Sequence, residues 1–105
     1  MGILIKTMEE SNKTKNLLEL ITKKIEEQIL NNKAIFINVI GINFSYKNIL
    51  NVDTYEIDQQ HISLIDNNCE VNINLNDFTI IKYENIIEEY FTILQNDIEF
   101  NFYFI

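Results

Sequence analysis

The sequence predicts an α+β fold in which an N-terminal helix packs on an antiparallel β-sheet. Near the N-terminus, apolar residues recur at three- and four-residue steps, which is typical of an amphipathic helix. In several later segments every second residue is apolar, which is typical of half-buried strands. The 105 residues are enough for one domain with a single core, and no linker or internal repeat divides them. We therefore expect a single domain over residues 1–105.

The helix is expected over residues 7–31. One apolar stripe runs along it, formed by Leu17, Leu18, Ile21, Ile25 and Ile29. The pairs Thr7–Glu10 and Asn16–Glu19 both fit a capping box, so the helix can begin at either place. An isolated helix of this kind is only marginally stable in water, so its stripe must pack on the sheet that follows.

Residues 34–105 are expected to form six or seven antiparallel strands joined as a meander, in one sheet that is either open or curled into a partial barrel. The alternating pattern begins with residues 40–47, where Gly41 suggests a bulge or a sharp bend. A further strand is expected over residues 78–83. Residues 84–89 form either a turn of helix or a loop.

Two hairpins can be placed by their register. If Asn67–Asn68 forms a two-residue turn, Leu64 faces Val71 on one side of the sheet, and asparagine tolerates the positive φ that such a turn needs. A second hairpin is expected to turn at residues 95–97. The strand that returns from it has phenylalanines on one face, at Phe100, Phe102 and Phe104.

The last strand is unusual because apolar side chains lie on both of its faces. Such a strand is either central in a sheet or an edge strand that pairs with another chain. A central position is the favoured interpretation, and dimerisation or capture of a partner is the alternative. The candidate residues for that dimer or edge strand are Phe100, Phe102, Tyr103, Phe104 and Ile105.

The chain is acidic, with 16 Asp and Glu, eight lysines, no arginine and a net charge of −8. Residues 1–33 contain six lysines and five glutamates, a net charge of +1, whereas residues 34–105 contain two lysines and eleven carboxylates, a net charge of −9. A negative body repels nucleic acid and anionic membranes and attracts basic protein surfaces. We therefore expect no direct nucleic-acid partner and no membrane partner.

The composition also favours a cytoplasmic location. The opening residues do not have the pattern of a signal peptide, and no stretch reaches the ~18 apolar residues of a membrane span. The single cysteine cannot form an internal disulfide. Ile and Asn together supply 37 of the 105 residues, a bias typical of A/T-rich genomes such as those of low-GC bacteria and their phages and other mobile elements.

No pattern of catalytic residues stands out, so we expect no enzyme, no cofactor and no metal site. His61 has no nucleophile or orienting acid at a recognisable spacing, and a surface or strand-end role is expected for it. Cys69 lies at the other end of the same hairpin, which argues against a Cys–His pair, and its acidic neighbours disfavour the thiolate. One histidine and one cysteine are too few soft ligands for a zinc site, and the carboxylate clusters are expected to form a solvated surface.

These features favour a non-catalytic protein-binding module whose acidic sheet face docks on a basic surface of a partner. Nucleases and host-defence effectors have such surfaces, so an inhibitor or immunity-type protein that acts as a nucleic-acid mimic is expected. The expected contact residues are carboxylates with tyrosine anchors, namely Tyr55, Glu56, Asp58, Glu70, Tyr83, Glu88, Glu89, Tyr90 and Glu99. The alternative is a structural or assembly subunit that forms a homodimer through its C-terminal strand.

Overall fold

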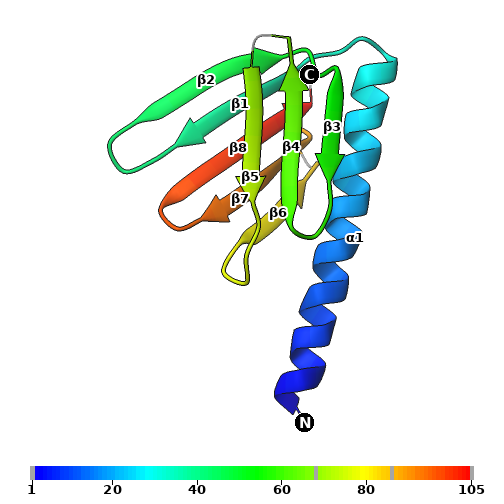
Figure 1. The fold of residues 1–105 in the computed structure, drawn as a ribbon, viewed down its shortest axis with the longest axis vertical. Coiled ribbons are helices and arrows are strands. Elements are labelled where there is room, and N and C mark those ends of the chain that lie inside the picture. Colours follow the sequence, from blue (N-terminus) through cyan, green and yellow to red (C-terminus); the bar gives the residue numbers. More distant parts are fainter. Residues whose placement is uncertain (1, 68, 86, 105) are drawn as a thin grey trace.

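The computed structural model describes residues 2–67, 69–85 and 87–104, with side chains from Lys13 onward. It confirms the α+β fold, with one helix and two antiparallel sheets (Figure 1). The elements are α1 (Gly2–Leu30), β1 (Ile35–Ile40), β2 (Ser45–Leu50), β3 (Thr54–Ile57), β4 (His61–Asp66), β5 (Cys69–Asn74), β6 (Ile80–Glu84), β7 (Tyr90–Gln95) and β8 (Ile98–Phe104). Among the described residues, no helix is both long enough and apolar enough to span a membrane.

The strands form two sheets, which corrects the expectation of a single meander. One sheet has five strands in the order β2-β1-β8-β7-β6, and the other has three in the order β3-β4-β5. The strands of the smaller sheet cross those of the larger sheet (Figure 1). The helix α1 runs along one side of the pair, close to β6 and to β3 (Figure 1).

The core lies between the two sheets and the helix. Leu18, Ile21 and Ile25 of the predicted stripe are buried there. The two sheets contribute further buried residues, including Ile35, Ile37, Ile62, Leu64, Ile73, Phe91, Ile93 and Phe102. The rings of Phe91 and Phe102 stack with their centroids 4.6 Å apart. Both sheets therefore use one alternating set of side chains for the core, which leaves the other set on the outer faces.

Two of the expected element boundaries are wrong. The helix begins at Gly2, so neither of the capping pairs marks its start. Residues 40–47 are not one strand, because the backbone N–H of Gly41 donates to the carbonyl of Phe44 (2.9 Å) and closes the turn between β1 and β2. Gly41 therefore begins a hairpin turn instead of forming a bulge. The alternating pattern predicted one strand because it continues through the turn with Ile42, which is 76% exposed.

Both predicted hairpins are present. Leu64 pairs with Val71 between β4 and β5, as expected, although the turn residue Asn68 lies outside the described residues. Between β7 and β8, Gln95 pairs with Ile98, and Asn96 has a φ of 56° in the turn. The described residues between β6 and β7 form a loop, without a turn of helix.

The C-terminal strand β8 is the central strand of the five-stranded sheet. It pairs with β1 on one side and with β7 on the other. The edge position considered for Phe100, Phe102, Tyr103 and Phe104 is therefore wrong, and Ile105 lies outside the described residues. Because both sides of its backbone are paired, β8 cannot extend the sheet into a second chain.

Candidate functional site

The outer face of the three-stranded sheet is open to solvent except at Ser63, which is buried in the middle of the central strand. Tyr55 and Ile57 of β3 pack inward, so Thr54 and Glu56 face outward, and the same alternation applies to β4 and β5. In Figure 1 this sheet lies in front of the five-stranded sheet, and no described element covers it. We call this surface the acidic face, and define it by Thr54, Glu56, Asp58, His61, Ser63, Ile65, Glu70, Asn72 and Asn74.

Negative charge is concentrated on this sheet and its loops. Residues 51–80 contain no lysine or arginine and six carboxylates, which are Asp53, Glu56, Asp58, Asp66, Glu70 and Asp77. Five of them are exposed, and the half-buried Asp66 accepts a hydrogen bond from the backbone N–H of Asn51 (2.8 Å). His61 is the one residue of this segment that can become a cation.

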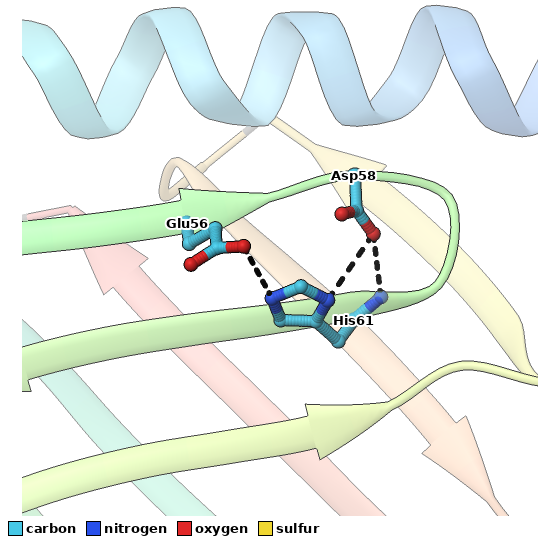
Figure 2. A group of neighbouring side chains, drawn as sticks. All are labelled: Glu56, Asp58 and His61. Atoms are coloured by element: carbon cyan, nitrogen blue, oxygen red, sulfur yellow. Dashed lines mark hydrogen bonds and ion pairs between the residues drawn. The ribbon is translucent and has the colours of Figure 1, made fainter.

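Glu56, Asp58 and His61 form a cluster at one end of the acidic face (Figure 2). Nδ1 of His61 lies 3.3 Å from Oδ1 of Asp58, and Nε2 lies 3.2 Å from Oε1 of Glu56. Oδ1 of Asp58 also accepts the backbone N–H groups of Gln60 (2.7 Å) and His61 (2.9 Å) in the β3–β4 turn. These backbone hydrogen bonds, with a smaller contribution from the His61 ring, hold the pKa of Asp58 below its usual range.

The residue pattern alone did not predict that these three side chains lie together, although a signal for the cluster exists. The turn places Gln59–Gln60 between Asp58 and His61, and the backbone N–H of Asp58 donates to the carbonyl of His61 (3.0 Å). A two-residue turn at these glutamines would have predicted that the two residues face each other. The sequence does not indicate that turn, because glutamine is not among the residues that favour it.

Three of the expected contact residues instead hold the helix to the sheet. The Tyr83 hydroxyl donates to Oε2 of Glu89 (2.6 Å), and Nζ of Lys24 lies 3.1 Å from the same oxygen. The hydrogen bond from Tyr83 lowers the pKa of Glu89, and Lys24 lowers it further. Burial, followed by the bond to Glu89, raises the pKa of Tyr83. Tyr55 donates to Glu26 of α1, which raises the pKa of Tyr55.

The remaining expected contact residues lie on or beside the five-stranded sheet. On the outer face of that sheet, the rings of Tyr90 and Tyr103 stack with their centroids 5.0 Å apart. The Tyr90 hydroxyl donates to Glu84 (2.8 Å), and this hydrogen bond raises the pKa of Tyr90. Glu99, on the same face, accepts a hydrogen bond from Asn101 (3.1 Å). Glu88 is exposed in the loop before β7. The structure therefore brings only Glu56, Asp58 and Glu70 together on the acidic face.

A groove of about 420 Å³ separates α1 from the β3–β4 turn. Leu18 and Ile57 form part of its lining, and Asp58 lies at the end that adjoins the acidic face. Charges of both signs line the helix side of the groove, at Lys15, Glu19, Lys23 and Glu26. The groove therefore does not extend the strongly negative character of the acidic face.

No protein-family model matches this chain, and neither the curated proteins nor the solved structures include a match to it.

Proposed function

We propose that this protein is a non-catalytic binding module that acts in the cytoplasm and docks its acidic face on a basic surface of a partner protein. One observation supports the proposal above all others: residues 51–80 contain six carboxylates and neither lysine nor arginine. Glu56, Asp58 and Glu70 project from paired strands and their turn, so the charges are held on a defined surface. Such a field accelerates encounter with a cationic partner and makes binding sensitive to salt.

The expected partner is a protein whose own ligand is a nucleic acid. The groove of a nuclease or host-defence effector is lined with basic side chains that bind phosphates, and fixed carboxylates can occupy the same positions. The protein would then be an inhibitor or immunity-type protein that competes with the nucleic acid. The binding set is smaller than the sequence predicts, because Tyr55 and Glu89 contact the helix and Tyr83 donates a hydrogen bond to Glu89.

The test compares two variants that lose equal charge on different surfaces. The first, Glu56→Gln/Asp58→Asn/Glu70→Gln, neutralises the acidic face. The matched control, Glu84→Gln/Glu88→Gln/Glu99→Gln, neutralises three carboxylates on and beside the five-stranded sheet. Wild type and both variants are immobilised, exposed to lysate of the native host at low salt, and eluted with a salt gradient.

We expect wild type and the control to retain the same basic nucleic-acid-binding protein. The first variant should retain about tenfold less of it, or lose it entirely. The retained protein should elute as salt rises, and its nuclease or nucleic-acid-binding activity should fall when wild type is added. Equal retention by both variants would contradict a role for the acidic face. Equal loss from both would show that net charge, and not this face, governs binding.

A further inference from the structure

We infer that Glu56 and His61 bind one divalent transition-metal ion on the acidic face, with Asp58 as the positioning residue for the imidazole. The expectation of no metal site considered only cysteine and histidine as zinc ligands, whereas the fold brings one imidazole between two carboxylates. The ligand atoms of all three side chains lie within 4.8 Å of one another (Figure 2). This inference does not depend on the proposed partner.

Asp58 fixes which nitrogen of His61 is available to a metal ion. Its Oδ1 is held by two backbone N–H groups of the turn and lies 3.3 Å from Nδ1 of His61. A neutral imidazole therefore donates its Nδ1–H to Asp58 and directs the lone pair of Nε2 toward Glu56. A carboxylate on the far nitrogen is the usual partner of a metal-binding histidine, because it sets the tautomer and the ring orientation.

On the other side of the ring, Nε2 of His61 lies 3.2 Å from Oε1 of Glu56. One ion can therefore contact both atoms. A zinc ion at ~2.1 Å from both atoms would subtend an angle of about 100° at the metal, close to tetrahedral. The Glu56 side chain is 73% exposed, so it can adjust to the ion.

The donor atoms also select the class of metal. An imidazole nitrogen with a carboxylate oxygen suits zinc, nickel, cobalt or copper, whereas calcium and magnesium prefer sites made of oxygen alone. Three further carboxylates of the acidic sheet and its loops, Asp53, Glu70 and Asp77, are exposed and raise the local concentration of cations. Two protein ligands leave coordination positions open to water, so the site should bind less tightly than a closed structural zinc site.

Zinc chloride, titrated into the full chain, is the probe for this site. All proteins in the experiment carry Cys69→Ser, so that the thiol cannot bind the metal. Calorimetry gives the stoichiometry and affinity, and nitrogen NMR of the imidazole identifies the coordinated atom. Because His61 is the only histidine, its ring signals can be assigned without ambiguity. Magnesium chloride is titrated in parallel as the oxygen-preferring control.

We expect one zinc ion per chain, a coordination shift at Nε2 and no saturable magnesium binding. His61→Asn and Glu56→Gln should each weaken zinc binding by more than tenfold, and Asp58→Asn by about tenfold with Nε2 coordination retained. Glu70→Gln removes a charge from the same face without removing a ligand, so its effect should stay near twofold.

A loss with Glu70→Gln as large as that with Glu56→Gln would show only a diffuse ion atmosphere. No saturable zinc binding, or a shift at Nδ1, would also overturn the inference. The readouts use metal alone, so the outcome is independent of the partner experiment.

Discussion

The carboxamide oxygen of Asn38 is buried on the outer side of the five-stranded sheet, and no partner for it exists in the described part of the protein. Asn38 faces Lys47 on β2 and Asn101 on β8. Farther along the same row, Thr92 donates a hydrogen bond of 2.7 Å to Asn101. In this row the Asn101 oxygen therefore has a donor, whereas the Asn38 oxygen has none among the described residues. An unsatisfied buried acceptor costs about 1–3 kcal/mol.

We predict that Asn38→Val raises the free energy of unfolding by about 1 kcal/mol, because it removes the unpaired oxygen and places a β-branched side chain in a strand. Thr92→Val is the matched control. It should lower the free energy of unfolding by about 1 kcal/mol, since it leaves the Asn101 oxygen without its donor. Urea denaturation measures both values. A decrease for Asn38→Val would contradict the prediction and show that the Asn38 carboxamide stabilises the fold.

Glu89 makes stability dependent on pH. Its pKa is lowered in the folded protein by the Tyr83 hydroxyl and by Lys24. A group with a lowered folded pKa stabilises the protein above its unfolded pKa of about 4.3, and this contribution is lost as pH falls through the folded value. Because the carboxylate is 31% exposed, its contribution at neutral pH should be modest, about 1 kcal/mol.

We therefore predict that Glu89→Gln lowers the free energy of unfolding at pH 7 by about 1 kcal/mol, and that the difference from wild type shrinks as pH falls below the unfolded pKa of about 4.3. Urea denaturation at a series of pH values measures the two curves. Glu88→Gln changes the exposed neighbour and should stay within about 0.5 kcal/mol of wild type throughout. A constant difference between wild type and Glu89→Gln at all pH values would contradict the ionic contribution.

The strands β2 and β6 are the two edges of the five-stranded sheet, and each has a lysine at or near its centre. Lys47 and Lys82 are the only lysines in residues 34–105, and both lie in the row that crosses the outer face through Asn38, Asn101 and Thr92. Lysine on an edge strand opposes pairing with another chain. On β2 the Asn48 side chain also opposes such pairing, because its oxygen accepts the backbone N–H of Ile49 (2.8 Å).

We predict that Lys47→Val/Lys82→Val causes dimers or larger assemblies to form, because it leaves two edges rich in β-branched residues and without positive charge. Light scattering after size-exclusion chromatography measures the mass. Lys13→Val/Lys33→Val makes the same chemical change at exposed positions outside the sheets, and it should elute like wild type. If both double variants elute like wild type, the lysines are not what keeps the edges unpaired.

The parts of the fold that the sequence predicts are those fixed by neighbours along the chain. The hairpins β4–β5 and β7–β8 have short turns, and alternation alone sets their register. Alternation does not determine to which sheet a strand belongs, so the division into two sheets was not predictable. Likewise, the pairing of β1 with β8 joins residues such as Ile35 and Phe104, and no local pattern encodes that contact.

The same limit explains which site residues were predicted. Glu56 and Glu70 lie on the acidic face because they alternate with the buried residues of their own strands. The ion pair of Glu89 with Lys24 depends on where the helix docks, which the helix sequence does not specify. Glu99 is far from the acidic face because its strand belongs to the larger sheet.

The pairing of β1 with β8 also restricts when the protein can fold. While the chain leaves the ribosome, β1 and β2 emerge early, but the strand that must lie beside β1 is synthesised last of the eight. Until then the apolar side of that early hairpin has no sheet to join, and it is open to wrong contacts. Closure across so many intervening residues is slow, so the nascent protein should depend on a chaperone more than its small size suggests.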